Sequence, residues 1–395
     1  MTNAATGDRV EQSADGDHRA RRDALVARSR AEMAVLEAEL KELAEQIGRP
    51  IKVMEVCGTH TVNACRSGVH SLMPEVVTLV SGPGCPVCVT AQRYIDALIE
   101  LGRRPEVIVT TYGDMLRVAG AGGSLELARS EGADVRVVTS ALEAVEIAQQ
   151  NPQREVVFAA VGFETTAPAS ASAVITACDL ELKNFSILPA HKLVIPAMNA
   201  LLKDPDIQID GFLCPGHVSV IIGSTVFGPL VEEYSKPCVI VGFEANQIMQ
   251  GIVHLARQIL NREAQLENLY PQAAKPEGNE IAQQLIDRVF VPGNAAWRAL
   301  GEMAESGLDV RQEFEQFDAA KRLGITLGED HEPPGCRCGE VITGRCQPLD
   351  CTLFGSVCTP IYPIGPCMVS SEGSCQAYFR YRRNELKTPA AVGTS

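Results

Sequence analysis

The sequence has no excess of positive charge and no long apolar run. Its 395 residues include 35 Lys and Arg against 49 Asp and Glu, a formal net charge of −14, so the surface has no general attraction for nucleic acid or anionic lipid. No apolar run reaches the roughly eighteen residues that a membrane span requires, and the N-terminal stretch lacks the apolar centre of a signal peptide. We therefore expect a cytoplasmic protein whose partners include neither nucleic acid nor a membrane.

Cysteine is abundant instead, with 14 residues in an otherwise ordinary composition of 46% hydrophobic and 21% charged residues. A reducing cytosol does not favour a disulfide framework, so metal ligation, redox chemistry or inert packing must explain these thiols. Most of them fall in two groups, at positions 57–88 and 336–375. The isolated Cys178 and Cys238 are predicted to pack in the core as small hydrophobes. The role of Cys214, packing or functional, stays undecided because a Pro-Gly-His motif follows it.

Short apolar runs alternate with helical patterns over most of the chain. Eight runs, among them IKVMEV and EVVFAAV, each lead into a turn and usually into a helical segment, which predicts an α/β fold with parallel strands covered on both faces. The string VGFE occurs after two of these runs and favours two Rossmann-like α/β lobes over a single sheet. The predicted division is a disordered extension over 1–22, a first lobe with an N-terminal helix over 23–150, a second lobe over 151–251 and a C-terminal domain over 252–395, helical over 252–270 and 279–325 and then rich in loops.

The first candidate site is Cys57-Gly-Thr-His60, directly after a predicted strand. Ligands bind at the carboxyl ends of parallel strands, and the start of the next helix favours a thiolate, which attacks electrophiles and binds metals. His60 is close enough to be a second ligand, a proton carrier or a hydrogen-bond donor. In the alternative interpretation, Thr59 or Thr61 caps the helix and Cys57 only fills space.

The second candidate site is Cys85-Pro-Val-Cys88, which follows another predicted strand and begins a helix. A C-x2-C motif at a helix start is typical of thiol–disulfide exchange, and it is also half of a tetrahedral metal site. Zinc would need a second pair of ligands, which only Cys57 and His60 could supply. Weaker polar motifs, which include His191 and His217, fall at other predicted strand ends and indicate a cleft between the lobes.

The C-terminal group contains seven cysteines within forty residues and several prolines. Paired zinc knuckles are missing from it. The wide and irregular gaps favour a loop-rich segment around a cubane iron–sulfur cluster held by four thiolates, although the spacing alone does not select the four.

Several long strings, including MEVCGTHT, SGPGCPVCVT, PAHKLVIPAM and MVSSEGSCQAY, resemble the HypD family of [NiFe]-hydrogenase maturation factors over about residues 30–383. The resemblance implies two α/β lobes and a helical domain that carries a [4Fe-4S] cluster. The family's cysteine spacing is met here by Cys338, Cys351, Cys358 and Cys375, which leaves Cys336, Cys346 and Cys367 as spectators. The N-terminal extension is not part of the family pattern.

The resemblance also implies a function, namely a scaffold on which an Fe(CN)2CO unit is assembled, rather than a multiple-turnover enzyme. In the family, the scaffold works with the chaperone HypC, receives cyanide from HypE and passes the iron unit to the hydrogenase large subunit. Its iron-carrying and redox cysteines map onto Cys57 and the pair Cys85 and Cys88, to which the cluster would supply electrons.

Two other functions remain open on the sequence. An iron–sulfur-dependent thiol–disulfide oxidoreductase would use the same Cys85 and Cys88 pair but would give Cys57 and His60 no role. A zinc-stapled nucleotide-binding enzyme is disfavoured, because the glycines near position 120 lack the phosphate-loop spacing. The sequence does not decide the source of carbon monoxide and iron, the use of ATP, the oligomeric state or the roles of His60, His191 and His217.

Overall fold

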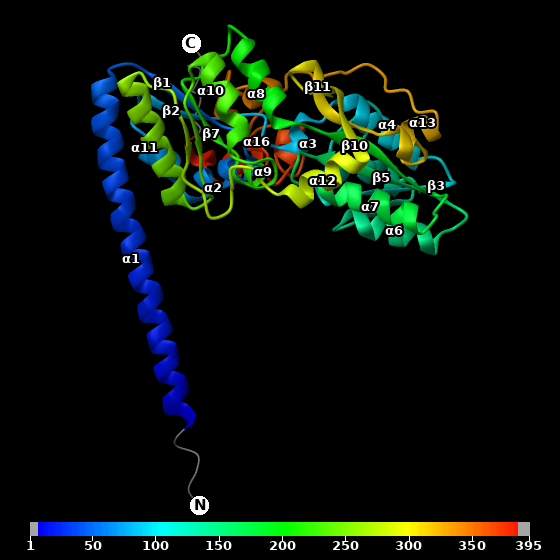
Figure 1. The fold of residues 1–395 in the computed structure, drawn as a ribbon, viewed down its shortest axis with the longest axis horizontal. Coiled ribbons are helices and arrows are strands. Elements are labelled where there is room, and N and C mark those ends of the chain that lie inside the picture. The colour runs from blue at the N-terminus through cyan, green and yellow to red at the C-terminus, as the bar shows by residue number, and fades with distance from the viewer. Residues whose placement is uncertain (1–6, 386–395) are drawn as a thin grey trace, which may run out of the picture.

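The computed structural model describes the backbone of residues 7–385 and the side chains of residues 24–385. It contains two separate parallel sheets, which lie toward opposite ends of the body (Figure 1). The fold class predicted from the alternating pattern is confirmed, since all eight predicted strands form and pair in parallel.

The first lobe is built on a five-stranded sheet in the order β2-β1-β7-β8-β9. Its strands are β1 (Ile51–Glu55), β2 (Val77–Ser81), β7 (Gly211–Cys214), β8 (Cys238–Ile240) and β9 (Leu266–Asn268). Its helices are α1 (Gly7–Ile47), α2 (Gly58–Ser67), η1 (Val69–Leu72), α8 (Val194–Lys203), α9 (Gly216–Ile222), η3 (Thr225–Phe227), α10 (Gly228–Tyr234) and α11 (Ala245–Asn261).

The second lobe is built on a four-stranded sheet in the order β4-β3-β5-β6. Its strands are β3 (Val107–Thr111), β4 (Val135–Val137), β5 (Glu155–Gly162) and β6 (Phe185–His191). Its helices are α4 (Gln92–Gly102), η2 (Gly113–Arg117), α5 (Leu125–Ser130), α6 (Ala141–Gln150) and α7 (Ala167–Asp179). The short helix α3 (Pro86–Val89) begins at the turn after β2 of the first lobe and packs against β5 of the second.

The predicted division of the lobes at residue 151 is wrong, because the two sheets are interleaved along the chain. Strands β3 and β4, expected in the first lobe, share a sheet with β5, while β7 and β8, expected in the second, share a sheet with β1. The VGFE strings do fall in different sheets, after β5 and after β8. Apolar periodicity identifies a strand but not its neighbour, since parallel partners are joined by long crossovers.

Helix α1 begins well before the predicted start at about residue 23. Residues 7–22, expected to be disordered, continue the helix; they contain no proline and many good helix formers. The prediction for residues 1–6 lies outside the described residues. Further along, α1 packs against α11 (Figure 1) and buries Leu40. It ends at Ile47 before Gly48, whose φ of +66° suits glycine.

The region after residue 252 is less helical than predicted. Helix α11 ends at Asn261, residues 266–268 form β9, and α12 (Glu280–Val289) is followed by an antiparallel hairpin of β10 (Phe290–Trp297) and β11 (Gly301–Val310). Short η4 (Gln312–Phe317) and α13 (Ala319–Arg322) follow it. The Pro-Gly pair at 292 and 293 prevents α12 from continuing, and the hairpin packs against β6 of the second lobe.

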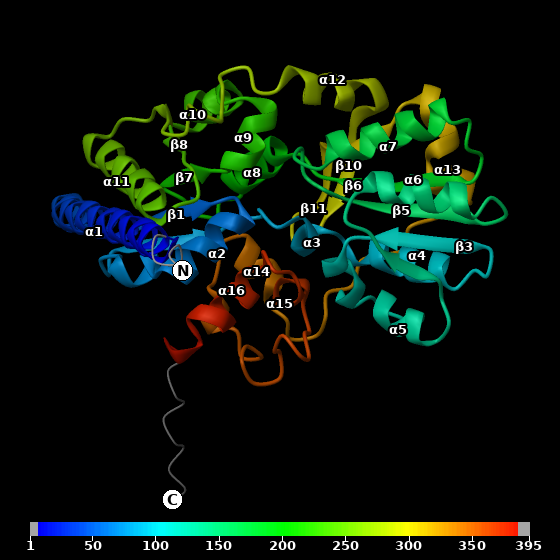
Figure 2. The same ribbon diagram turned by 90° about the horizontal axis from the view of Figure 1, so that it is seen from below.

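The cysteine-rich C-terminal segment is short and rich in loops, as expected. It contains α14 (Cys338–Ile342), η5 (Pro348–Asp350), α15 (Pro366–Val369), α16 (Ser374–Tyr381) and η6 (Arg383–Glu385). Phe354, Met368 and Tyr378 form its small buried core. Figure 2 shows this segment beneath α2 and α3, against which its helices pack.

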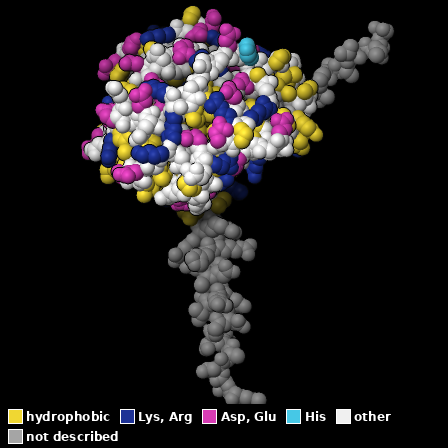
Figure 3. All heavy atoms as spheres, turned by 90° about the vertical axis from the view of Figure 1, so that its right-hand side faces the viewer, with side chains coloured by type: hydrophobic (Ala, Val, Ile, Leu, Met, Phe, Trp, Pro, Cys, Tyr) yellow, Lys and Arg dark blue, Asp and Glu magenta, His cyan; other side chains and the backbone are white. Residues whose placement is uncertain are grey.

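Charged side chains of both signs occur together on the face of the body that Figure 3 shows. Within the described chain, no helix combines the length and apolar character needed to cross a membrane.

Candidate functional site

Two strand-to-helix turns of the first lobe touch each other through their backbones. Gly58 follows β1 and donates its N–H to the carbonyl of Gly84, which follows β2, at 3.2 Å. A Cβ atom on Gly84 would collide with the backbone of Cys57, and one on Gly58 would lie 2.6 Å from Cβ of Glu372. Glycine is therefore required at both positions, because a larger residue would separate the turns that carry the cysteines.

Cys57 is the N-cap residue of α2 and is buried. Burial raises the pKa of its thiol to about 12, with further raising by Glu372 and Glu55, while the backbone N–H groups of His60 and Thr59 act in the opposite direction. The N–H groups of the helix start do lower the pKa of the thiol, as expected, but they do not outweigh burial in the metal-free protein. Desolvation of a buried charge exceeds the effect of the helix N-terminus here.

Glu55, at the end of β1, was not identified from the sequence. Its carboxyl group is buried, accepts the backbone N–H of Cys57 at 3.0 Å and also accepts the Thr61 hydroxyl. Burial raises its pKa to about 8. An acidic residue ending an otherwise mainly apolar strand was the available signal, since such a side chain needs partners or a proton.

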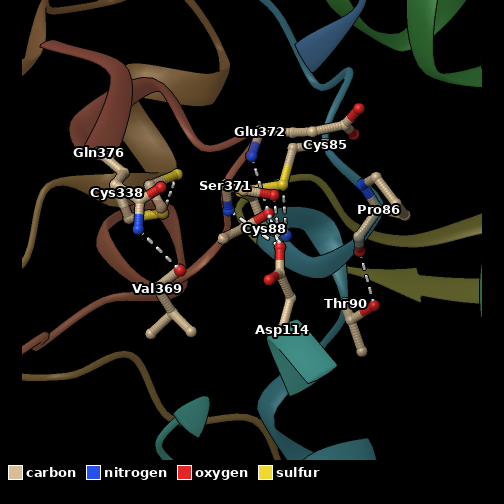
Figure 4. The surroundings of a disulfide bond; sticks show 12 residues. Cys85, Pro86, Cys88, Thr90, Asp114, Cys338, Val369, Ser371, Glu372 and Gln376 are labelled. Carbon is tan, nitrogen blue, oxygen red and sulfur yellow. Dashed lines mark hydrogen bonds between the residues drawn. A yellow bond between two sulfur atoms is a disulfide. The ribbon is translucent and has the colours of Figure 1, made fainter. Parts of the chain in front are cut away.

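Cys85 and Cys88 form a disulfide in this structure (Figure 4). Cys85 is the N-cap of α3, Pro86 occupies its first turn, and the N–H of Cys88 donates to the Cys85 sulfur at 3.2 Å. Thr90 closes the short helix by donating to the carbonyl of Pro86 at 2.8 Å. The C-x2-C motif thus has the geometry of a pair that can form and break a disulfide.

A turn of the C-terminal segment, residues 370–372, joins these two sites (Figure 4). The Ser371 N–H donates to Asp114 of η2 at 2.9 Å, and Thr59 of α2 donates its hydroxyl to Glu372 at 3.0 Å. Burial raises the pKa of Glu372. Glu372 was not identified from the sequence, although it lies within the string MVSSEGSC.

Two of the three predicted histidines, His60 and His217, pack against Phe243, and the third lies in the other lobe. The His60 ring is buried, donates Nε2–H to the carbonyl of Gly242 at 3.0 Å, and has a pKa lowered to about 4 by burial. His217 stacks on Phe243 of the same turn, with ring centroids 3.9 Å apart. His191 instead lies in the second lobe, hydrogen-bonded to Ser170. The polar motifs therefore divide between the two lobes.

One cavity in the C-terminal segment is lined by six cysteines. They are Cys336, Cys338, Cys351, Cys358, Cys367 and Cys375, accompanied by apolar side chains such as Phe354 and Met368. The four residues expected to be cluster ligands are all among them, and so are two of the expected spectators. Cys346 is not.

Two of the sulfur atoms in this cavity lie close to each other. The sulfur atoms of Cys338 and Cys367 lie 2.7 Å apart, and this contact lowers the pKa of Cys338 and raises that of Cys367. The N–H of Ile364 donates to the Cys358 sulfur at 3.3 Å. Thiol donors in an apolar hollow fit a thiolate-bound cluster, although no three or more His, Cys, Asp or Glu residues within 24–385 already stand in a metal-binding arrangement.

The isolated cysteines differ in how deeply they are buried. Cys238 and Cys214 are fully buried in neighbouring strands of the first lobe, so the core prediction for Cys238 is confirmed. Cys178 on α7 is only partly buried. Cys65 on α2 packs with Phe354 and Tyr378 of the C-terminal segment.

Comparison with known proteins identifies similar chains over nearly this whole length. A family model described as HypD, the hydrogenase formation hypA family, matches residues 32–382. The hydrogenase maturation factor HypD of Escherichia coli is 42% identical over 338 residues, 85% of this chain and 91% of that protein. HypD of Azotobacter vinelandii is 43% identical over 378 residues, 94% and 98% of the two chains. The hydrogenase expression/formation protein HupD of Azotobacter chroococcum is 44% identical over 369 residues, 92% and 96%.

Proposed function

The chain belongs to the HypD family of hydrogenase maturation factors, and we propose that it is the scaffold on which the Fe(CN)2CO unit of a [NiFe]-hydrogenase is assembled. One observation carries the proposal. The turn of Cys57, the loop of the Cys85–Cys88 disulfide and the 370–372 turn are in direct contact or hydrogen-bonded through their neighbours. A potential iron ligand and a redox pair are thereby held together by the segment that contains the six-cysteine cavity.

Cys57 is proposed to carry the iron. A thiolate is a soft donor, which suits iron with strong-field ligands. Because burial keeps the free thiol protonated at neutral pH, iron must displace that proton when it binds. The carboxyl groups of Glu55 and Glu372 lie close enough to influence this thiol electrostatically.

The Cys85–Cys88 pair is proposed to supply reducing equivalents. Release of cyanide from a thiocyanate carried by HypE breaks the S–C bond and consumes two electrons, giving a thiolate and cyanide. Oxidation of one dithiol to a disulfide provides two electrons and releases two protons. The pair therefore balances one cyanide release and must then be reduced again.

Cys338, Cys351, Cys358 and Cys375 are proposed to hold a [4Fe-4S] cluster, which supplies single electrons when bound. These residues line the same apolar cavity, whose walls limit access of water. The helices α14 and α15 of this segment pack against α3, which contains Cys88.

The partners proposed from the family resemblance are HypC, HypE and, through HypC, the hydrogenase large subunit. We propose the cytoplasm as the site of assembly, because free thiols persist in a reducing compartment.

Anaerobic infrared spectroscopy of the protein co-purified with HypC tests this function. We expect absorption bands of iron-bound cyanide and carbon monoxide, and we expect Cys57→Ser to lose them. Cys65→Ser is the matched control, since Cys65 lies on the same helix but packs into the C-terminal core; it should keep the bands. Bands that persist unchanged in Cys57→Ser would contradict the role of Cys57.

A thiol–disulfide oxidoreductase is the second candidate, favoured by the disulfide at Cys85 and Cys88. Such an enzyme would reduce a protein disulfide and would show no cyanide or carbonyl bands. The same infrared measurement therefore separates the two functions.

A further inference from the structure

A second cavity lies in the second lobe, outside the thiol sites. It is bounded by β6, by the β10–β11 hairpin and by the start of α4. Its space of about 820 Å³ includes its open mouth. Small side chains, among them Ala91, Ala190, Ala295 and Gly307, leave this space free.

Lys192 is the charged group set deepest in the wall of this cavity. Its side chain is 5% exposed, and its ammonium nitrogen lies 5.8 Å from the ring centre of Trp297. Among residues 24–385, the hydrogen bonds and ion pairs of the structure do not include this nitrogen, and Lys192 lines the open space of the cavity. Burial of an ammonium is costly, and it lowers the pKa of Lys192 to about 8, although the more distant charges of Glu302 and Asp330 act in the opposite direction.

The other charges near Lys192 are already engaged. Arg93, on α4, forms ion pairs with Glu302 of β11 at 2.5 Å and with Asp330 at 3.3 Å. Asp318 caps α13 by accepting two backbone N–H groups. One positive charge is thus left without a partner, whereas several carboxylates around the cavity would repel a multiply charged anion.

We propose that this cavity binds a small monocarboxylate, whose single negative charge pairs with the Lys192 ammonium and whose uncharged body fills the space between the alanines. A planar carboxylate accepts hydrogen bonds from an ammonium, and the partly apolar wall accommodates a short carbon chain. A chloride ion would leave most of the cavity unfilled, and phosphate would meet Glu302 and Asp309 at the wall.

The cavity shares a wall with the disulfide loop. Thr90 and Ala91 line it and come directly after the helix that contains Cys88. Thr90 forms a β-bridge to Trp297, and the N–H of Arg298 donates to the carbonyl of Val89 at 2.8 Å. A ligand held at Lys192 would therefore contact the segment that continues from the redox pair.

The test uses the fluorescence of Trp297, the only tryptophan of the chain. The purified protein is titrated with sodium acetate, sodium propionate and sodium lactate, against sodium chloride at equal ionic strength. We expect a saturable change with at least one carboxylate and none with chloride. Lys192→Met should weaken binding roughly tenfold or more, because a charge-assisted hydrogen bond is lost. Lys203→Met, an exposed lysine on α8, should bind as the unaltered protein does.

Two further measurements keep the result decisive. Lys192→Met should melt at the same or a higher temperature, since it removes an unpaired buried charge, and only the unaltered protein should gain thermal stability from the carboxylate. Binding should weaken as the pH rises through about 8, where Lys192 loses its proton among Arg93, Glu302 and Asp330. The absence of a saturable response to all three carboxylates, an equal response in Lys192→Met, or tighter binding of inorganic phosphate would each overturn the proposal.

Discussion

The two lobes have the same architecture, yet only one of them presents thiols at its strand ends. In the first lobe the turns after β1 and β2 contain Cys57 and the Cys85–Cys88 pair. In the second lobe the corresponding edge holds Glu164, His191 and Lys192, all buried. A parallel sheet therefore offers a binding edge in both lobes, but the residues of the turns decide which chemistry is possible there.

The lobes also differ in what covers that edge. The cysteine-rich segment packs on the first lobe's turns, where Gly58 permits the close approach of Glu372. The β10–β11 hairpin packs on the second lobe, where the bridge between Lys192 and Gly307 attaches it to the sheet. The cysteine-rich segment supplies the six thiols of its cavity, whereas the β10–β11 hairpin supplies small side chains that leave a cavity against the second lobe.

The largest expected effect is on hydrogenase activity, when the redox pair Cys85 and Cys88 of the first lobe is removed. In cells that depend on this protein, Cys85→Ser/Cys88→Ser should reduce hydrogenase activity to background, while the purified variant keeps its brown colour. The reason is that a dithiol is needed to provide two electrons. Cys346→Ser, outside the six-cysteine cavity, is the control and should retain activity. Normal hydrogenase activity in the double variant would show that the pair is not required.

Single Cys→Ala variants of the cysteine-rich C-terminal segment test which residues hold the cluster. Each variant is analysed anaerobically for iron and sulfide. Loss is expected at Cys338, Cys351, Cys358 and Cys375, because a missing thiolate leaves one iron without its ligand. Retention is expected at Cys336, Cys346 and Cys367. Because Cys336 and Cys367 also line the cavity, loss at either of them in place of one of the four would reassign the ligands.

The lobes should resemble each other in their response to pH, since each buries a carboxyl group. Burial raises the pKa of Glu55 to about 8 and of Glu164 to about 7, from 4.5. The folded protein therefore holds protons that the unfolded chain releases, and this stabilisation is complete below about pH 4.5 and is lost as the pH rises through these values. The free energy of unfolding should fall by up to about 3 kcal/mol for Glu164 across this range.

Urea unfolding at several pH values measures this dependence. Glu164→Gln should flatten the curve up to about pH 7, and Glu55→Gln should flatten it up to about pH 8, because glutamine cannot ionise. If the unfolding free energy changes with pH as steeply in both variants as in the unaltered protein, neither carboxyl group holds a proton in the folded state.

The smallest effects are expected for the isolated cysteines. Cys238→Ser in the first lobe should cost about 1–3 kcal/mol, because the serine hydroxyl would be buried among apolar side chains. Cys178→Ser in the second lobe should change stability by less than about 0.5 kcal/mol, since that side chain is partly exposed. Thermal unfolding compares them, and an equal loss in both would contradict the difference in burial.

Local patterns predicted much of the fold. Apolar periodicity and turn residues predicted eight of the strands, β1 to β8, the end of the first helix at Gly48 and the two candidate turns at Cys57 and Cys85. The β10–β11 hairpin did not follow, since its strands lack a clear alternation and depend on packing against β6. Glu55 and Glu372 were missed because a carboxyl group reads as a surface residue until its burial is known.

The sequence by itself determined that this is a parallel α/β protein with thiols at strand ends and in a loop-rich tail, because these properties depend on residues close together in the chain. Only the tertiary structure decided that β3 pairs with β5 and β1 with β7, that burial keeps the Cys57 thiol protonated, and that Cys336 and Cys367 share a cavity with the expected ligands. These properties depend on contacts between distant segments. Strand partners and desolvation have no counterpart in local spacing.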